Sequence, residues 1–442
     1  MSEVRARLAW WLYAALMRLL QTPLLFKLWW RGRREPIYRQ HLAQRFGFYP
    51  GPSPKGGWVW LHAVSLGETR AAAALIQALR AAHPEMRLLL THSTATGWAA
   101  GQGLLAPGDC QVWAPWDAPA AVQRFFRVFQ PRLGLLMETE VWPGWLRAAR
   151  QHGVPMVLVN ARLSARSADR AGAWASLMRP AYAGLALGLA QSDADAQRLR
   201  GLGLEQVLVV GNLKYDMAID PDLRARGQRW RLQSARPVVL LASSREGEEA
   251  MWAQAVASLP WANAVQWLLV PRHPQRVDAV ATLLAQAGWG VERRSAWPST
   301  GPVAAAEAPV VWLGDSMGEM ASYCSAADVA LLGGSFAPLG GQNLMEVLAC
   351  ACPVITGPHM HNFATALHDL QGEAVAQTPS MAQALQLVHQ WLADPAALRR
   401  RGALGQQLVQ AHGGAVARSV DALDAWLPKS GGREHGAQQL DA

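Results

Sequence analysis

ADVALLGGSFAPLGGQNLMEVLACACPVITGPHMHNF, at residues 327–363, alternates short apolar runs with glycine-rich turns. Val329–Leu332 and Val354–Thr356 have the length and aliphatic content of buried strands, and Gln342–Cys352 between them has the length of a helix. Strand, glycine loop, helix and strand predict a right-handed βαβ unit. The loop of such a unit lies at the carboxyl edge of the sheet, where open α/β proteins bind ligands.

The glycine loop of this unit, residues 333–341, suits an anionic ligand. Gly340 and Gly341 let backbone N–H groups come close to a ligand, and the start of the following helix favours a phosphate. Glu346, inside that helix, is placed to accept hydrogen bonds from a ribose diol. The alternative is a turn that only packs a helix on its sheet, because a glycine loop alone is weak evidence for a nucleotide site.

The rest of the chain repeats this alternation in two blocks. One block begins at Trp58 and the other at Val238, and the polar stretch IDPDLRARGQRWRLQSAR lies between them. Strands separated by helices of this length predict an α/β fold of two parallel, doubly wound sheets, with strand ends facing a central cleft. The predicted segments are an N-terminal helix at 1–35, a Rossmann-like domain at 36–218, a linker at 219–236, a second Rossmann-like domain at 237–428 and a flexible tail at 429–442.

Composition narrows the class of protein. The chain has 442 residues, of which 51% are hydrophobic, so it is long enough for two ordered domains. A net charge of +9 suits nucleic acid, an anionic membrane surface or a phosphorylated substrate. No nucleic-acid-binding motif occurs, so we expect no nucleic-acid partner. The four cysteines have no zinc or disulfide-framework spacing, which favours a reducing compartment, and Cys350 and Cys352 are predicted core residues.

The most hydrophobic region is LAWWLYAALMRLLQTPLLFKLWW, at residues 8–30. Arg18 and Lys27 interrupt it, which makes it a poor spanning helix, and no signal-peptide cleavage site follows. Tryptophans and arginines around leucines are typical of a helix in the membrane interface. We expect residues 1–35 to anchor the protein to a membrane surface, with the catalytic body cytoplasmic. The alternative is an amphipathic helix docked on its own domain.

Polar side chains follow the strands predicted for the first domain. Glu68 follows the strand that begins at Trp58, and Glu138 and Glu140 follow the apolar run LGLLM. Paired carboxylates are poor core residues, because an unpaired buried charge is costly. Glu68 is either a helix-start acid stabilised by the helix dipole or a general base that takes a proton from an acceptor hydroxyl.

The strands predicted for the second domain also end in polar residues, at Ser243–Glu248, Pro271–Pro274 and Gly314–Glu319. Each stretch alone is compatible with a helix cap. Because the carboxyl ends of parallel strands meet at one edge of a sheet, these stretches together predict a ligand site.

No metal site is predicted. Asp193 and Asp195 form an acid pair, but Ser192 before them favours a helix N-terminus. His359 and His361 lack an evident third ligand, and no P-loop, G-x-S-x-G or H-E-x-x-H pattern occurs.

Seven strings occur in order along the chain: LHAVSLGET, METEVWPG, VNARLS, GNLKYD, VPRHP, GDSMGEM and GGQNLMEV. Together they resemble the 3-deoxy-D-manno-octulosonic acid (Kdo) transferases of lipopolysaccharide synthesis, over essentially the whole chain. The resemblance implies a glycosyltransferase B-type fold, with the acceptor in the N-terminal half and the CMP-activated sugar in the C-terminal half. It also implies an enzyme on the cytoplasmic face of the inner membrane that transfers Kdo, with inversion, from CMP-Kdo to the lipid A precursor (lipid IVA).

The resemblance also implies roles for single residues. Glu68 is the implied general base, and Glu138 and Lys214 are implied to support the transition state. The implied donor-binding residues are Pro271, Arg272, Met317, Gly318, Glu319, Asn343, Leu344, Met345 and Glu346. CMP carries a single phosphate, so cationic side chains and a helix N-terminus can balance the leaving charge, and we expect no metal or other cofactor.

The chain departs from the family pattern at Gly144, at Ser244-Arg245 and at Gln342, where asparagine, Thr-His and histidine are usual. Arginine and glutamine still donate hydrogen bonds, so we expect altered donor contacts with activity retained.

Three other functions fit the same architecture. They are a UDP-sugar-dependent lipid glycosyltransferase, a nucleotide-sugar epimerase and a non-enzymatic two-domain binding protein. The hydrophobic N-terminus argues against a soluble epimerase. Glu68 beside two further carboxylates suits chemistry better than the mere binding of an anionic sugar.

Overall fold

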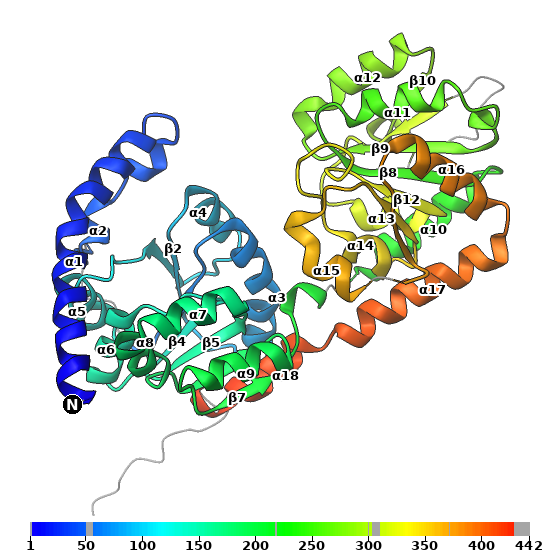
Figure 1. Ribbon diagram of the computed structural model, residues 1–442. Coiled ribbons are helices and arrows are strands. Elements are labelled where there is room, and N and C mark those ends of the chain that lie inside the picture. Colours follow the sequence, from blue (N-terminus) through cyan, green and yellow to red (C-terminus); the bar gives the residue numbers. More distant parts are fainter. Residues whose placement is uncertain are drawn as a thin grey trace, which may run out of the picture. The chain divides into compact units, whose positions relative to one another are not determined.

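The computed structural model describes residues 2–49, 56–216, 219–298, 300–302, 310–370 and 372–427. The chain divides into an N-terminal unit, Met1–Asp216 with Gly413–Ala442, and a C-terminal unit, Met217–His412. Each unit contains a parallel sheet of seven strands (Figure 1). The prediction of two doubly wound α/β domains is confirmed, whereas the predicted tail at 429–442 lies outside the described residues.

The sheet of the N-terminal unit has the order β3-β2-β1-β4-β5-β6-β7. Its strands are β1 (Val59–His62), β2 (Leu88–His92), β3 (Cys110–Trp113), β4 (Leu133–Met137), β5 (Met156–Ala161), β6 (Leu187–Ala190) and β7 (Val207–Val209). Its helices are α1 (Ser2–Arg31), α2 (Leu42–Arg45), α3 (Leu66–Ala82), α4 (Ala95–Gln102), α5 (Pro119–Phe129), α6 (Pro143–Gln151), α7 (Ala165–Ala173), α8 (Ala175–Tyr182), α9 (Asp193–Gly201) and α18 (Ala415–Leu423). The strand order reverses between β1 and β4, so this pair is the switch point of the sheet.

Alternating side chains of each strand bury both faces of this sheet. In β1, Trp60 packs with the aromatic residues of α5 and α6 on one face, whereas Val59 and Leu61 pack with α3 on the other. A strand buried on both faces reads as a continuous apolar run, which is why the strands were recognisable in the sequence.

The sheet of the C-terminal unit has the order β10-β11-β9-β8-β12-β13-β14, and its switch point lies between β8 and β12. Its strands are β8 (Val238–Ser244), β9 (Gln266–Pro271), β10 (Gly290–Arg293), β11 (Val310–Leu313), β12 (Val329–Leu332), β13 (Val354–Thr356) and β14 (Val375–Gln377). Its helices are α10 (Pro221–Gln233), α11 (Glu248–Val256), α12 (Val277–Gln286), α13 (Met320–Ala326), α14 (Leu344–Ala349), α15 (Ala364–Asp369), α16 (Met381–Leu392) and α17 (Pro395–His412).

The βαβ unit predicted at residues 327–363 is confirmed, because β12 and β13 pair in parallel at the predicted positions. Its helix is shorter than predicted. The side chain of Asn343 accepts a hydrogen bond from the Met345 N–H and starts α14 at Leu344, and Ala351, with φ 61°, lies in the turn after it. Cys350 and Cys352 are buried, as predicted.

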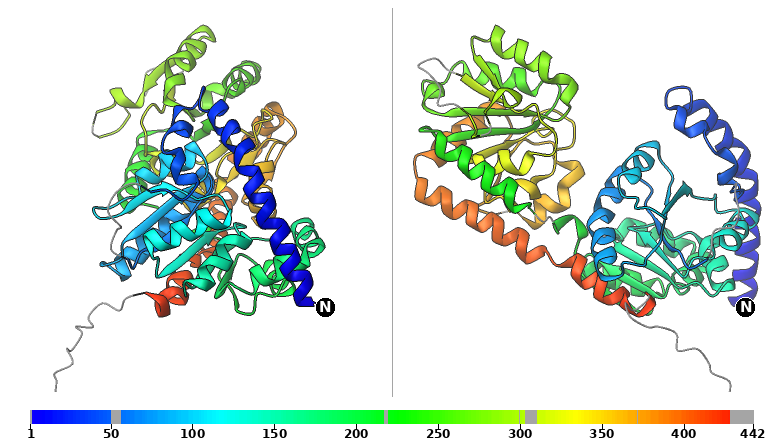
Figure 2. Two further views of the ribbon diagram at one scale, coloured as in Figure 1. Left: turned by 90° about the vertical axis from the view of Figure 1, so that its left-hand side faces the viewer. Right: turned by 180° about the vertical axis from the view of Figure 1, so that it is seen from behind.

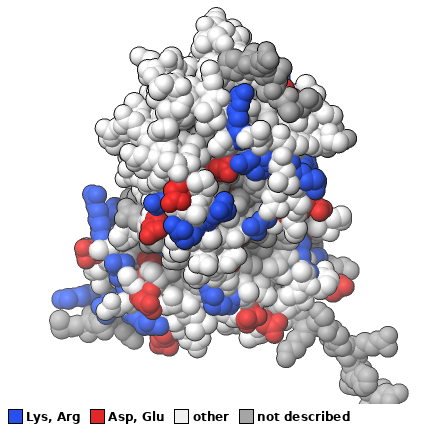
Figure 3. Space-filling view, turned by 90° about the vertical axis from the view of Figure 1, so that its right-hand side faces the viewer, with Lys and Arg blue, Asp and Glu red and all other residues white. Residues whose placement is uncertain are grey.

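The segment 219–236 is not a free linker, because most of it forms α10, which packs against α13. A Cβ on Gly227 would lie 2.1 Å from the Ser322 carbonyl oxygen, and Trp230 is buried against Trp297 and Tyr323. Because α10 contains many arginines, the few residues that pack against α13 give no clear apolar pattern in the sequence. Two of those arginines bind acids of the same unit: Arg226 pairs with Glu319 and Arg231 with Asp328. Figure 3 shows basic side chains beside acidic ones on one face of the molecule.

The second domain ends earlier than the predicted residue 428. After Gly413 the chain returns to the N-terminal unit, where α18 packs on α3 (Figure 2). Ala415 and Leu423 are buried in the same core as the α3 side chains, and Asp216 accepts hydrogen bonds from the backbone of the turn that starts α18. Such a long-range return leaves no local signal in the sequence.

The N-terminal helix α1 lies against its own unit, in contact with α8. Among the described residues, no helix is both long enough and apolar enough to cross a membrane. The Tyr13 hydroxyl donates to Asp117 Oδ2 at 2.6 Å, and the same oxygen accepts from the Gly144 N–H at 2.8 Å. A Cβ on residue 144 would lie 2.4 Å from Asp117 Oδ1, so the glycine makes room for this buried carboxyl group. We call the trio of Tyr13, Asp117 and Gly144 the α1 latch.

Candidate active site

Three carboxylates follow the two strands at the switch point of the N-terminal sheet. Glu68 follows β1, and Glu138 and Glu140 follow β4, the neighbouring strand. We call Glu68, Glu138 and Glu140 the acid cluster. Its position at the carboxyl edge of a parallel sheet is where ligands bind to folds of this type.

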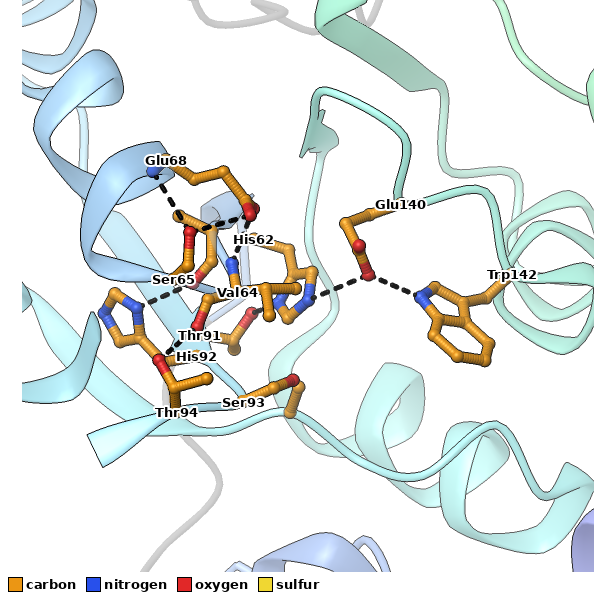
Figure 4. Close-up of polar contacts among 12 residues, drawn as sticks. His62, Val64, Ser65, Glu68, Thr91, His92, Ser93, Thr94, Glu140 and Trp142 are labelled. Carbon is orange, nitrogen blue, oxygen red and sulfur yellow. Dashed lines mark hydrogen bonds and ion pairs between the residues drawn. The ribbon is translucent and has the colours of Figure 1, made fainter. Parts of the chain in front are cut away.

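Glu68 is held by the start of α3 (Figure 4). Ser65 is the N-cap, and its hydroxyl accepts from the Glu68 N–H at 3.4 Å and donates to Glu68 Oε1 at 2.9 Å. The Val64 N–H donates to Glu68 Oε2 at 2.8 Å. This reciprocal arrangement is a capping box, which fixes the side chain in one orientation. The structural role considered for Glu68 is therefore present, and the fixed carboxylate remains available for chemistry.

The protonation of Glu68 is tuned by its surroundings. Burial raises its pKa to about 7, the donors Val64 and Ser65 oppose this rise, and the negative charges of Glu140 and Glu138 add to it. A carboxylate with a pKa near neutrality is matched to general acid–base work.

Glu140 lies beside a buried histidine. Its Oε2 accepts from the Trp142 indole N–H at 2.8 Å and lies 3.9 Å from His62 Nε2 (Figure 4). Burial lowers the pKa of His62 to about 3, so the ring is neutral and the contact is not an ion pair. Burial also raises the pKa of Glu140. Sequence reasoning noted Glu140 but gave it no role and overlooked His62, whose position at the end of β1 was the available signal.

Glu138 and Lys214 are brought together across the sheet edge. Lys214 Nζ donates to Glu138 Oε1 at 2.8 Å. Glu138 has φ 54°, a left-handed conformation that costs a non-glycine residue on the order of 1–3 kcal/mol. The buried side chain of Asn160 accepts from the Leu213 N–H at 3.0 Å and so positions the short helix Leu213–Tyr215 that carries the lysine. Asn160 is therefore a positioning residue, whereas the sequence indicated only a polar residue at a strand end.

The acid that follows the first strand of the C-terminal sheet has a different environment. Glu248 is completely buried at the start of α11. Its Oε2 accepts from the N–H groups of Arg245 at 2.8 Å and Gly334 at 2.7 Å, and its Oε1 accepts from those of Phe336 at 2.9 Å and Ala337 at 3.3 Å. This carboxylate ties the loop after β8 to the glycine loop after β12.

The next residue, Glu249, also has its carboxylate bound by neighbouring side chains. Glu249 forms a bidentate pair with Arg276, with distances of 2.8 and 2.9 Å, and accepts from the buried Ser244 hydroxyl at 2.7 Å. Ser244 therefore has a structural partner at one of the positions that depart from the family pattern.

Two of the implied donor-binding residues, Arg272 and Glu346, interact with each other. Pro271 ends β9 and Arg272 follows it, with the Arg272 N–H bonded to the Ser244 carbonyl at 2.9 Å. Burial raises the pKa of Glu346, and the charge of Arg272 opposes the rise, so the two side chains interact. An arginine after β9 and an acid in α14 that interact in this way can bind the phosphate and the ribose of one nucleotide.

The implied donor residues after β11 differ in exposure. Met317 is exposed, and Gly318, with φ 78°, has open space around it. The carboxylate of Glu319 is already bound by Arg226, Arg294 and Ser316. Glu319 is therefore part of the packing between α10 and α13.

The implied donor residues at α14 are mostly internal. The side chains of Leu344 and Met345 are buried, so only their backbone is available to a ligand, and Asn343 caps the helix. The Gly341 N–H donates to the Gly334 carbonyl within the loop at 2.6 Å, and a Cβ on Gly340 would lie 2.1 Å from Asn362 Nδ2. Both glycines allow this loop to pack closely, which was the alternative reading of the sequence.

Comparison with solved structures supports the fold. The UDP-GlcNAc 2-epimerase from Neisseria meningitidis, solved with UDP-GlcNAc bound, superposes with a TM-score of 0.54, covering 84% of this chain and 100% of that chain. At 14% identity this likeness shows the fold alone, which is the two-sheet α/β arrangement of glycosyltransferases of B type.

Sequence comparison gives the family. The model described as 3-deoxy-D-manno-octulosonic-acid transferase (kdotransferase) matches residues 40–217. The 3-deoxy-D-manno-octulosonic acid transferase of Bordetella pertussis is 45% identical over 421 residues, which cover 92% of this chain and 96% of that protein. The enzyme of the same name from Haemophilus influenzae is 33% identical over 95% of this chain and 99% of its own length. The chain belongs to the Kdo transferase family, and the predicted resemblance is confirmed.

Proposed function

We propose that this protein transfers Kdo from CMP-Kdo to a hydroxyl of the lipid A precursor lipid IVA, with inversion at the anomeric carbon. The observation that carries the proposal is the 45% identity, over 92% of the chain, to the Kdo transferase of Bordetella pertussis. The acid cluster adds a fixed carboxylate whose pKa of about 7 suits proton removal at neutral pH.

The chemistry assigns one bond change to each part of the site. The acceptor oxygen forms a bond to the anomeric carbon, the bond from that carbon to the phosphate oxygen of CMP breaks, and the acceptor proton passes to Glu68. Loss of CMP leaves cationic character at the anomeric carbon, which a nearby carboxylate stabilises. Glu138 takes that role, and Lys214, paired with it at 2.8 Å, binds either the carboxylate of the sugar or the leaving phosphate.

The C-terminal unit binds the donor in this proposal. Arg272 balances the phosphate charge and Glu346 accepts from the ribose hydroxyls, with Pro271, Met317, Gly318 and the backbone of residues 343–345 around them. Glu319 acts by fixing this segment through Arg226 and Arg294. Arginine and backbone donors supply the charge balance that a single phosphate needs, so the reaction is proposed to need no metal.

Helix α1 attaches the protein to the cytoplasmic face of the inner membrane in this proposal. Most of its exposed large apolar side chains lie along one side of the helix. We call eight of them the outer stripe: Val4, Leu8, Trp11, Leu12, Leu16, Leu19, Phe26 and Trp30. Trp11 and Leu19 are 63% and 74% exposed, which is unusual for apolar side chains unless another surface covers them. Such a stripe with flanking arginines suits a helix that lies in the interface.

The decisive experiment supplies freshly generated CMP-Kdo and tetraacyl lipid A precursor to wild type and to Glu68→Ala. We expect a product whose mass increases by Kdo in wild type, with little product in the variant. A folded wild type that binds CMP and forms no product would overturn the acceptor assignment.

A competing donor is tested in the same assay. A UDP-sugar-dependent transferase of the same fold would be protected from unfolding by UDP and not by CMP. We expect CMP to raise the melting temperature, and we expect Arg272→Ala to weaken that protection. Protection by UDP alone would show that the donor is a UDP-sugar and not CMP-Kdo.

A further inference from the structure

A groove in the N-terminal unit is lined by residues of α1, α6 and α8. These three helices are labelled in Figure 1. The groove contains a cavity of about 490 Å³, and a second cavity of about 220 Å³ shares Trp10, Arg147 and Gln151 with the first. The two cavities are therefore neighbours along α1. We infer that this groove binds an acyl chain of the acceptor lipid and a phosphate next to it. This inference rests on the proposed function and adds a subsite to it.

The walls of the groove are apolar. Trp10 of α1, Leu146 of α6 and Leu177 of α8 line the larger cavity, with proline and alanine residues between them. Leu146 is buried and belongs to the core of the unit, so this part of the wall is fixed by packing. A concave site with a continuous apolar lining suits a hydrocarbon chain.

The rim of the groove is basic. Arg7, Arg147 and Arg150 line the larger cavity, and Arg18 joins Arg147 at the smaller one. None of the described residues that line either cavity is acidic. The Arg147 guanidinium lies 4.7 Å from the centre of the Trp10 ring, where the aromatic face orients it. Arginines bind phosphate through paired N–H donors, so the occupant carries a phosphate beside its apolar part.

The groove begins where the acid cluster ends. Pro143 lines the larger cavity and Gly144 the smaller one, and both directly follow Trp142, whose indole N–H is bound by Glu140. One end of the groove thus lies within four residues, along the chain, of Glu140 in the acid cluster. This continuity favours the acceptor over an unrelated lipid.

The α1 latch keeps the third wall of the groove in place. Tyr13 binds Asp117 one helical turn from Trp10, and Gly144 belongs to both the latch and the groove. The outer stripe lies on another side of α1 and shares Trp11 with the smaller cavity. A helix lying in the interface through this stripe would open the groove at the edge of the membrane, where an acylated substrate enters.

The test compares acceptors and variants. We expect Arg147→Ala with Arg150→Ala to raise the KM for tetraacyl precursor about tenfold or more, with the KM for CMP-Kdo unchanged. Ala6→Trp, which fills the cavity, should raise the KM for tetraacyl precursor and leave that for the deacylated precursor unchanged. The matched control is Arg127→Ala, which removes an exposed arginine of α5 that lines neither cavity. Unchanged KM values in the double variant would overturn the inference.

A second readout does not depend on transfer. A tetraacyl precursor with a photoreactive diazirine in one acyl chain should crosslink to peptides of α1, α6 or α8 without donor, and unlabelled tetraacyl precursor should suppress the crosslink. Crosslinks elsewhere, or equal suppression by phosphatidylglycerol vesicles, would refute the acceptor subsite. Groove crosslinks in a protein that forms no Kdo product would instead preserve the lipid site and overturn the proposed reaction.

Discussion

Glu68 of the N-terminal unit and Glu248 of the C-terminal unit occupy equivalent places in their sheets. Each follows the first strand of its sheet and belongs to the first turn of the next helix. Glu68 accepts one backbone N–H and one hydroxyl, whereas Glu248 accepts four backbone N–H groups. The first is a partly exposed carboxylate with a pKa of about 7, and the second is completely buried.

The difference shows that partners, and not position, decide what a strand-end acid does. Gly333 brings the loop after β12 close to the end of β8, because a Cβ there would lie 2.3 Å from the Ser243 carbonyl oxygen. That approach delivers the N–H groups that occupy Glu248. The residues around Glu68 include further carboxylates, which raise its proton affinity.

The largest effect is expected when the charge of Glu68, the acid proposed for chemistry, is removed. Glu68→Gln keeps the shape of the capping box, so the melting temperature should change little. Because the variant lacks a general base, kcat should fall about 10²- to 10⁴-fold, with CMP binding retained. Transfer kinetics measure the effect, and a variant with more than a few per cent of the wild-type kcat would place the base elsewhere.

Replacing Glu248, the structural acid, should lower stability. Glu248→Ala leaves four buried N–H groups without their charged acceptor, so the free energy of unfolding of the C-terminal unit should fall by about 3 kcal/mol. Chemical denaturation measures this loss. Glu246→Ala is the matched control, because Glu246 is 57% exposed and its loss should change stability by less than about 0.5 kcal/mol. Equal effects in the two variants would contradict the role of Glu248 in tying the loop after β8 to the loop after β12.

The pH dependence of transfer should report the acid cluster. Glu68 acts as a base only when ionised, and its pKa is raised to about 7, so log kcat/KM should fall with unit slope as the pH drops below that value. In Glu138→Gln one of the neighbouring negative charges is gone, so the acid limb should move to lower pH. A wild-type limb between pH 4 and 5 would show that Glu68 is not the titrating base.

The smallest expected effect concerns the α1 latch. Tyr13→Phe removes the hydroxyl that donates to the buried Asp117, and the free energy of unfolding of the N-terminal unit should fall by about 1–2 kcal/mol. Hydrogen exchange should show faster opening of α1. Tyr182→Phe is the control, because it removes the hydroxyl of another buried tyrosine of the same unit, on α8 and outside the α1 latch. Unchanged exchange in Tyr13→Phe would mean that packing alone holds the helix.

The sequence was sufficient for features encoded locally. Uninterrupted apolar runs such as Val329–Leu332 predicted the strands, and Glu68 was recognised as an acid at the start of a helix. The capping box that Glu68 forms with Ser65 was not predicted. The role of Glu248 was not predictable, because its partners at Gly334 and Phe336 lie more than eighty residues along the chain. The segment 219–236 was predicted as a linker because most of its residues are charged or polar. The residues that pack against the unit, Gly227 and Trp230, are too few to give a recognisable apolar pattern.

The return of the chain at Gly413 has a consequence for synthesis on the ribosome. The core face of α3 is completed by α18, so the N-terminal unit cannot finish folding until the residues 217–412 have also been made. At bacterial-type elongation rates of about 5–20 residues per second, that delay is roughly 10–40 s. During this time the nascent first sheet exposes an uncovered apolar surface, so a chain that stops after α17 should be a target for chaperones and proteases.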